Sequence, residues 1–160
     1  MEMNQQVAIQ AREGIRRLIS LYCDAVARRD ADAVGNLLVD DVHITIAGGP
    51  PRIGREAAVA GLRKTIDNFG FLHQKCDTGL IDIDDDGTGA RARLGVMELN
   101  QAFGADTVNA IFGFYEDEYR LTDGGWRFAR REFTLQFRAV LPTAECQFLQ
   151  TFTPRFSFEP

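Results

Sequence analysis

The sequence predicts an α+β fold in which N-terminal helices close a curved antiparallel sheet around one apolar pocket. Up to about Asn68, apolar residues recur mainly at the three- and four-residue spacing of helices, and after Gly70 the chain has the pattern of long strands. Helices followed by a meander of strands are typical of a sheet that carries its helices on one face. Gly95 and Gly113, inside long strands, indicate a strongly coiled sheet that wraps around a cavity.

Three helices are expected in the first part of the chain. The apolar residues between about Val7 and Arg29 fall on one face of a long helix. Asp30 is suited to cap a second, short helix, because its carboxylate can accept a hydrogen bond from a free backbone N–H. Residues 42–47 alternate between apolar and polar side chains and predict a strand, and residues 55–68 predict the third helix.

Strands are expected over residues 80–83, 90–103, 108–121 and 126–140. Gly-rich segments between them predict turns, and the one at 122–125 makes the last two strands a hairpin. The final segment, residues 141–160, is rich in phenylalanine. An exposed aromatic tail is unusual, so this segment is expected either to cover the pocket mouth or a subunit interface, or to pad the outer face of the sheet.

Length and charge narrow the class of protein. The 160 residues have the size of one domain, and a net charge of −5 argues against nucleic acid or an anionic membrane as a partner. The polar N-terminus does not resemble a signal peptide, and no apolar run approaches the roughly 18 residues that span a bilayer. We therefore expect a cytoplasmic protein. Three cysteines far apart in the sequence fit reduced thiols rather than a disulfide framework.

Motifs for metals and nucleotide cofactors are incomplete. Asp82, Asp84 and Asp86 match the opening of a calcium loop, but the twelfth position, which needs a bidentate Glu, holds Arg93. The only two histidines, His43 and His73, lack the spacing of a zinc motif, and no P-loop or dinucleotide fingerprint is present. The sequence therefore predicts neither a metal nor a cofactor, and the aspartates are interpreted as a hairpin turn.

Three ordered segments resemble the SnoaL-like group of the nuclear transport factor 2-like superfamily. They cover most of the chain, from about Ile9 to Phe133. The segments are Leu-Tyr-Cys-Asp-Ala at 21–25 with its continuation to residue 42, Gly-Arg-Glu-Ala-Ala at 54–58, and Tyr-Glu-Asp-Glu-Tyr-Arg at 115–120 with Gly-Gly-Trp-Arg-Phe at 124–128 and Arg131. The ordered set is more specific for the superfamily than for any one activity.

The resemblance implies a cone-shaped sheet closed by helices over one deep pocket. Members of the group include scytalone dehydratase, lindane dehydrochlorinase, ketosteroid isomerase, polyketide cyclases and small subunits of aromatic-ring dioxygenases. The function expected from it is a cofactor-independent lyase, of dehydratase or dehydrohalogenase type, acting on a small apolar cyclic substrate. Homodimers or homotrimers are expected, because small cones of this kind bury the outer face of the sheet against a partner.

Asp24 and His73 match positions at which dehydratase- and dehydrochlorinase-type members carry an Asp–His dyad. In such a dyad a neutral imidazole takes the proton, and the carboxylate orients the ring and stabilises the imidazolium. Each residue also has a structural interpretation. Asp24 falls nearly opposite the apolar face of its helix, as a solvated Asp would, and His73 follows two apolar residues, as a structural His would.

Four further residues are predicted to line the pocket and bind substrate: Tyr22, His43, Tyr115 and Arg131. Arg131 lies on the apolar side of its strand and needs either a carboxylate, such as Glu98 or Asp117, or a substrate anion. Tyr22 matches the oxyanion-donor Tyr of ketosteroid isomerase and is otherwise a core Tyr.

Two other functions stay open at this stage. One is a non-catalytic ligand-binding or accessory subunit of the dioxygenase small-subunit kind, in which Asp24 and His73 would have no chemical role. The other is an isomerase or polyketide cyclase. Chemistry of the ketosteroid isomerase type is disfavoured, because Ile46 stands where that enzyme would carry its catalytic Asp.

Overall fold

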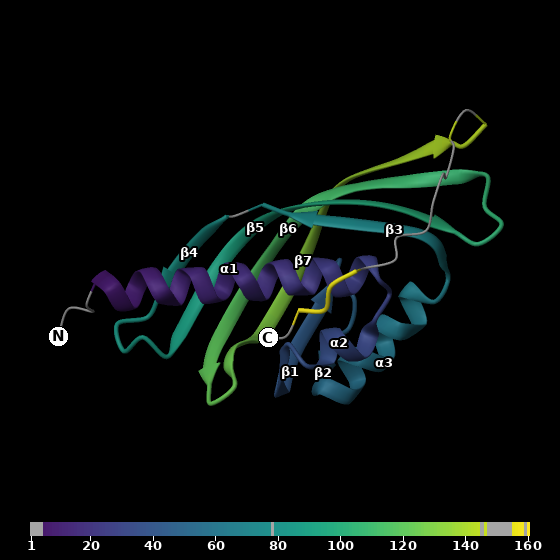
Figure 1. Ribbon diagram of the computed structural model, residues 1–160. Helices are drawn as coiled ribbons and strands as arrows, with labels where there is room; N and C mark the ends of the chain where they lie inside the picture. Colours follow the sequence, from purple (N-terminus) through teal and green to yellow (C-terminus); the bar gives the residue numbers. More distant parts are fainter. Residues whose placement is uncertain (1–4, 78, 145, 147–154, 159) are drawn as a thin grey trace.

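The computed structural model describes residues 5–77, 79–144, 146, 155–158 and 160, and shows helices packed into one strongly curved sheet (Figure 1). The described elements are α1 (Gln5–Ala27), α2 (Ala31–Gly35), β1 (Leu38–Ile46), β2 (Arg52–Ile53), α3 (Arg55–Ile66), β3 (Phe69–Cys76), β4 (Leu80–Ile83), β5 (Gly89–Ala102), β6 (Thr107–Thr122) and β7 (Gly125–Pro142). The α+β class and the helix-covered, curved sheet expected from the sequence are confirmed.

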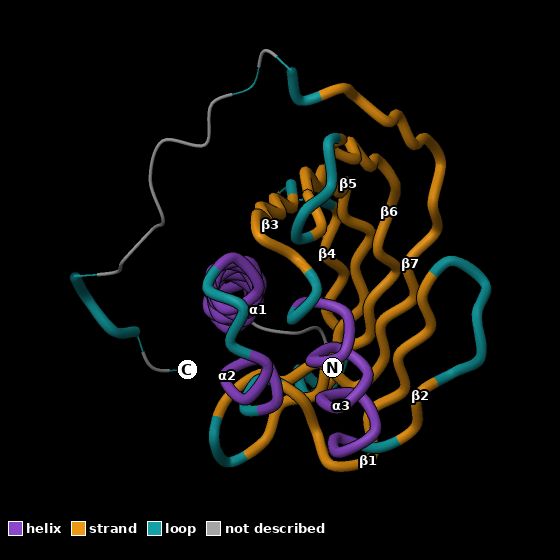
Figure 2. Tube along the Cα trace, turned by 90° about the vertical axis from the view of Figure 1, so that its right-hand side faces the viewer, coloured by secondary structure: helices purple, strands orange, loops and turns teal. Residues whose placement is uncertain are grey.

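The sheet is mixed rather than purely antiparallel. Its strands follow the order β2-β1-β7-β6-β5-β3, with β4 paired to β5, and β1 runs parallel to β7. The parallel pair joins the first and last long strands of the chain, and the helices and strands between them form the long connection that parallel pairing needs. The alternation of apolar and polar residues within each strand does not reveal this parallel pairing. Seen along α1, the sheet curves around the helix without closing on itself (Figure 2).

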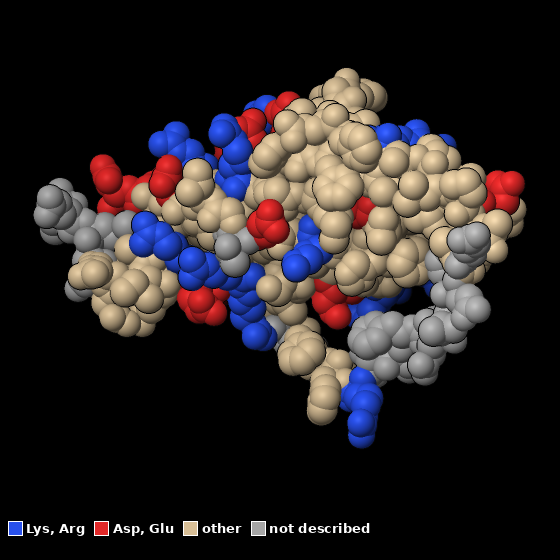
Figure 3. Space-filling model, turned by 90° about the horizontal axis from the view of Figure 1, so that it is seen from above, with Lys and Arg blue, Asp and Glu red and all other residues tan. Residues whose placement is uncertain are grey.

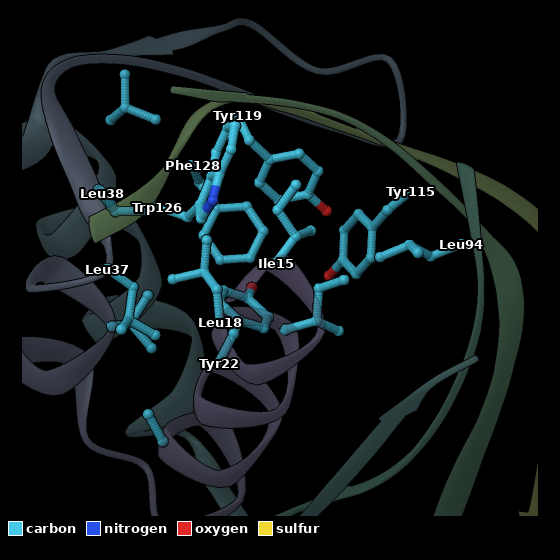
Figure 4. Packing of buried hydrophobic residues seen from close by; sticks show 14 of the residues in the cluster. Ile15, Leu18, Tyr22, Leu37, Leu38, Leu94, Tyr115, Tyr119, Trp126 and Phe128 are labelled. Atoms are coloured by element: carbon cyan, nitrogen blue, oxygen red, sulfur yellow. The ribbon is translucent and has the colours of Figure 1, made fainter. Parts of the chain in front are cut away.

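Helix α1 packs its apolar face into the concave side of the sheet. Ile15, Leu18 and Tyr22 recur on that face and are buried. Their side chains gather with Trp126 and Phe128 from the start of β7 (Figure 4). This contact follows from the three- and four-residue spacing of the sequence, because an apolar stripe on a helix is stable only when it is covered.

Asp30 caps α2, as predicted. Its Oδ1 accepts a hydrogen bond from the Ala33 backbone N–H at 2.9 Å, and its Oδ2 accepts one from Arg28 Nη1 at 2.9 Å. The Ala33 N–H and the Arg28 guanidinium together lower the pKa of Asp30 below its ordinary value, the backbone bond being the largest cause.

Replacing Asp30 with alanine is expected to lower the free energy of unfolding by about 0.5–2 kcal/mol at neutral pH. Because the folded-state pKa of Asp30 is lowered, its contribution is complete above the unfolded-state pKa and is lost as the pH falls through the folded-state pKa. Urea unfolding of both proteins at neutral and acidic pH checks this. The difference in the free energy of unfolding between the wild type and Asp30→Ala should become smaller in acid. Asp85 is exposed, so Asp85→Ala should unfold with the wild-type free energy at either pH.

Strand β3 was not predicted, and it changes the place of His73. No strand was expected between residues 68 and 80, whereas His73 lies inside β3, with Leu72 and Gln74 buried on either side of it. A polar Gln74 at an inward position hides the alternation that would mark this segment as a strand. Successive side chains of a strand point to opposite faces, so His73 points away from the interior that Gln74 enters.

Large apolar side chains are exposed on the convex face of the sheet. Met97, Phe112 and Phe137 lie in register on β5, β6 and β7, and each is more than a third exposed. From above, uncharged side chains cover a broad area of this side of the molecule (Figure 3). The predicted dimer or trimer, for which such a face is suited, stays a prediction.

The predicted aromatic tail is described only in part. Residues 141 and 142 end β7, and Phe148 and Phe152 lie outside the described residues. Phe156 and Phe158 are exposed and line a groove of about 240 Å³ beside α1 together with Leu21 and Asp24. Within the described part of the chain, no helix combines the length and apolarity needed to cross a bilayer.

Candidate functional site

The strand register arranges the inner face of the sheet in rows that cross neighbouring strands. The residues of these rows lie on the same face of the sheet as Tyr115, whose ring packs edge-on against Tyr22 of α1. From the open end of the sheet inward, the rows are Gln74–Glu98–Ile111–Arg138, Cys76–Val96–Gly113–Leu135, Leu94–Tyr115–Phe133 and Ala92–Asp117–Arg131. Polar groups therefore occupy both the outermost and the innermost of these rows.

The innermost row holds a buried ion pair. Arg131 Nε donates to Asp117 Oδ1 at 2.8 Å, and Arg131 Nη2 donates to Asp117 Oδ2 at 2.6 Å. The side chains are 1% and 0% exposed, so the predicted intramolecular partner of Arg131 is Asp117. A two-point bond of this kind offsets much of the cost of taking both charges out of water.

Aromatic rings enclose the Arg131 guanidinium. Its Cζ lies 4.2 Å from the ring centre of Tyr22, 3.9 Å from that of Tyr115 and 4.1 Å from that of Phe128. Tyr119 donates its hydroxyl to Asp117 Oδ2 at 2.8 Å. Burial raises the pKa of Tyr115 and of Tyr119 well above the ordinary 10, so both hydroxyls keep their protons at neutral pH.

The outermost row holds a carboxylate fixed by two amides. Gln74 Nε2 donates to Glu98 Oε2 at 2.8 Å, and Asn100 Nδ2 donates to Glu98 Oε1 at 2.6 Å. The second hydrogen of Gln74 Nε2 is directed to the Tyr115 hydroxyl at 3.3 Å. Gln74 therefore links the carboxylate of Glu98 to the aromatic cage around Arg131.

An amide chain continues from Glu98 to the rim. Asn109 Nδ2 donates to Asn100 Oδ1 at 2.9 Å, and Arg138 Nη2 donates to Asn109 Oδ1 at 2.7 Å. Arg138 can only donate and an ionised Glu98 can only accept, so the two ends of the chain fix which way each amide points. Three buried side-chain atoms are left without a hydrogen-bond partner in the described structure: Arg55 Nε, Gln74 Oε1 and Arg131 Nη1. The last two belong to this inner face.

Glu98 borders apolar side chains that are partly exposed. Glu98 itself is half-buried, and its cross-strand neighbour Ile111 is half-buried. Leu135, one row further in, is 43% exposed. A carboxylate beside accessible apolar side chains is the arrangement of a binding site for a mainly apolar molecule with a few polar groups.

Two thiols lie between these groups. Cys23 of α1 and Cys76 of β3 are free and half-buried. The hydrogen bond from the Cys76 thiol is the largest cause that lowers the pKa of Cys23 to about 7, with Arg131 contributing in the same direction. The same hydrogen bond and burial raise the pKa of Cys76. Cys23 is thus the more acidic thiol at the face of α1 that meets the sheet.

The structure brings together three of the six predicted site residues. Tyr22, Tyr115 and Arg131 meet in the interior, as described above. His43 lies on β1 with an exposed side chain, outside this cluster. The other two, Asp24 and His73, are not part of this cluster.

Asp24 and His73 make no hydrogen bond with each other among the described contacts. Asp24 Oδ2 accepts from Arg28 Nε at 2.9 Å on the outer side of α1, where the carboxylate is 37% exposed. His73 is exposed on the face of β3 opposite to Gln74. Among the described residues, no group of three His, Cys, Asp or Glu side chains is placed to hold a metal ion.

Gln74, Glu98 and Asn100 were not among the site residues predicted from the sequence. The signal that could have found them is a polar side chain at an inward position of a strand whose other inward residues are apolar, as in Val96 followed by Glu98. That signal needs the correct strand boundaries and register. For Gln74 the strand itself was not recognised.

Comparisons with known proteins agree with this architecture. A candidate scytalone dehydratase from Novosphingobium aromaticivorans DSM 12444 is 19% identical, with a TM-score of 0.80 over 98% of this chain and 100% of that one. A hexachlorocyclohexane dehydrochlorinase, LinA type 2, is 18% identical, with a TM-score of 0.80 over 92% and 98%. An NTF2-like protein with a cystatin-like fold, also from N. aromaticivorans, is 25% identical, with a TM-score of 0.68 over 80% and 83%.

No curated protein matches the sequence. The family model described as the SnoaL-like domain matches residues 7–132, which include most of α1, the buried ion pair, Gln74 and Glu98. The chain therefore belongs to the SnoaL-like domain family.

Proposed function

We propose that the protein is a cofactor-independent lyase or isomerase that acts on a small, largely apolar cyclic molecule at the inner face of the sheet. The single observation that carries the proposal is the Glu98 carboxylate, held by Gln74 and Asn100 beside accessible apolar side chains. Membership of the SnoaL-like family and the fold shared with a dehydrochlorinase support the class of reaction.

In the proposed reaction Glu98 removes a proton from carbon. In a lyase, the electron pair of the broken C–H bond forms a C=C bond to the neighbouring carbon as the leaving group departs. The group leaves as halide, or as water after Glu98 returns the proton to the departing oxygen. In an isomerase, Glu98 returns the proton to another carbon. A fixed carboxylate is suited to either step, because proton transfer needs the base held in one geometry.

The Asp24–His73 dyad stays a competing proposal for the base. Asp24 accepts from Arg28 on the outer side of α1 and His73 is exposed on β3, so a dyad facing the interior would require both side chains to move. Glu98 requires no such rearrangement. The two proposals differ in which residues matter, and this makes them separable by experiment.

The test is turnover in heavy water. Purified protein is incubated in D₂O with cyclic alcohols, cyclic halides and cyclic ketones, and mass spectrometry follows loss of water or halide and uptake of deuterium. Asp24→Asn and His73→Gln are compared with the wild type on any compound that reacts. If Glu98 is the base, both variants keep wild-type rates, since their side chains lie outside the interior cluster.

Loss of turnover in both variants, with folding intact by circular dichroism, would instead support the dyad. A protein that binds these compounds without loss of water or halide and without deuterium uptake would be a binding module. That outcome would favour the accessory-subunit interpretation over the enzyme.

A further inference from the structure

Gln74 Oε1 is a buried acceptor that the protein does not satisfy. Gln74 is 7% exposed, and Oε1 is without a hydrogen-bond partner in the described structure. Both hydrogens of its Nε2 are committed, to Glu98 at 2.8 Å and to the Tyr115 hydroxyl at 3.3 Å. A buried acceptor without a donor is costly, and native structures rarely leave one unless another molecule supplies the partner.

The amide of Gln74 cannot relieve this by turning over. Exchange of Oε1 and Nε2 would set the amide oxygen against the Glu98 carboxylate, which in its ionised form only accepts hydrogen bonds. Asn100 Nδ2 is directed to Glu98 and Asn100 Oδ1 accepts from Asn109, and neither atom is bonded to Gln74 Oε1 in the described structure. The hydrogen bonds from the rim to the core thus fix the orientation of the Gln74 amide. The atom of this amide that is left without a hydrogen bond is the acceptor Oε1.

We propose that Gln74 selects ligands that carry a hydroxyl group, whose O–H donates to Gln74 Oε1 next to Glu98. The inference rests on the proposed function and names its substrate class: an alcohol, enol or phenol on an apolar ring, in preference to the corresponding halide. The ring would lie on the apolar surface of Ile111 and Leu135, in the rows of Gln74 and Cys76. A halogen has no hydrogen to donate and would leave Oε1 unsatisfied.

A site that hydrogen-bonds a ligand hydroxyl discriminates strongly against an analogue that lacks it. We therefore expect 2-naphthol to bind about 10- to 100-fold more tightly than 2-fluoronaphthalene. The two probes share the ring system and differ at one small substituent. Equilibrium dialysis of the full chain with each probe gives the two dissociation constants without requiring turnover.

Replacement of Gln74 with methionine keeps the length of the side chain and removes its acceptor, so the preference for 2-naphthol should fall to near unity. The matched control is Leu135→Ala. Leu135 lies on β7, two residues after Phe133, which pairs with Tyr115, and its side chain is 43% exposed. Leu135→Ala should raise the dissociation constants of both probes by the same factor and leave their ratio unchanged. Near-ultraviolet circular dichroism confirms that each variant is folded.

Equal dissociation constants for the two probes in the wild type, or no binding of 2-naphthol, would overturn the inference even if Gln74→Met failed to fold. So would a preference that survives in a folded Gln74→Met protein. Failure of the proposed function is distinguishable, because turnover without hydroxyl preference contradicts this inference alone. Hydroxyl preference without turnover contradicts the enzyme alone.

Discussion

Replacement of Asp117 with alanine is expected to lower the free energy of unfolding by about 3–5 kcal/mol, because it leaves the Arg131 guanidinium buried and without its charge partner. Both bonds of the pair, at 2.8 and 2.6 Å, would be lost together. The aromatic rings around Arg131 cannot replace a carboxylate, since the attraction between a cation and a ring is weaker than a buried two-point ion pair. Urea unfolding at neutral pH measures the loss.

Two comparisons show whether the unpaired charge is the cause. The double replacement Asp117→Leu with Arg131→Met should recover most of the stability, because apolar side chains of similar size often substitute for a buried pair at little cost. Glu116 lies on the other face of β6 from Asp117 and makes an exposed ion pair with Arg93 of β5. Glu116→Ala removes this pair and should lower the free energy of unfolding by about 0–1 kcal/mol. An Asp117→Ala protein as stable as the Glu116→Ala protein would contradict the expected role of the pair.

Replacement of Glu98 with glutamine is expected to lower kcat/KM about 10²- to 10⁴-fold on any compound that the wild type converts, because an amide cannot accept the proton from carbon. Glutamine keeps the size of the side chain and one oxygen that Asn100 or Gln74 can bond. Ligand affinity should change far less than the rate, and stopped-assay kinetics beside dialysis separates the two.

The matched control is Glu116→Gln. This residue is on β6, carries the same change of charge, and faces away from Tyr115 and Asp117. It should keep the wild-type kcat/KM. If Glu98→Gln also kept the wild-type rate, Glu98 would not be the base, and the Asp24–His73 dyad would become the stronger proposal.

The α+β class, the buried face of α1 and the Asp30 cap were predictable because each is written in a short stretch of sequence. The face of α1 follows from the spacing of Ile15, Leu18 and Tyr22, and the cap follows from one carboxylate ahead of an apolar run. Arg131 was predictable as a buried cation in need of a partner, because it occupies a position on the apolar side of its strand. The choice of Asp117 over Glu98 as that partner depended on register.

Only the tertiary structure decided which polar residues meet. The parallel pairing of β1 with β7 links segments about ninety residues apart, which local periodicity does not record. A strand places neighbouring side chains on opposite faces, so β3 turns Gln74 toward Glu98 and leaves His73 exposed on the other face. The sequence by itself thus determined the class of fold and the need for a partner at Arg131. The register of β3, β5, β6 and β7 determined the site, because only cross-strand pairing brings Gln74, Glu98 and Tyr115 within hydrogen-bonding distance.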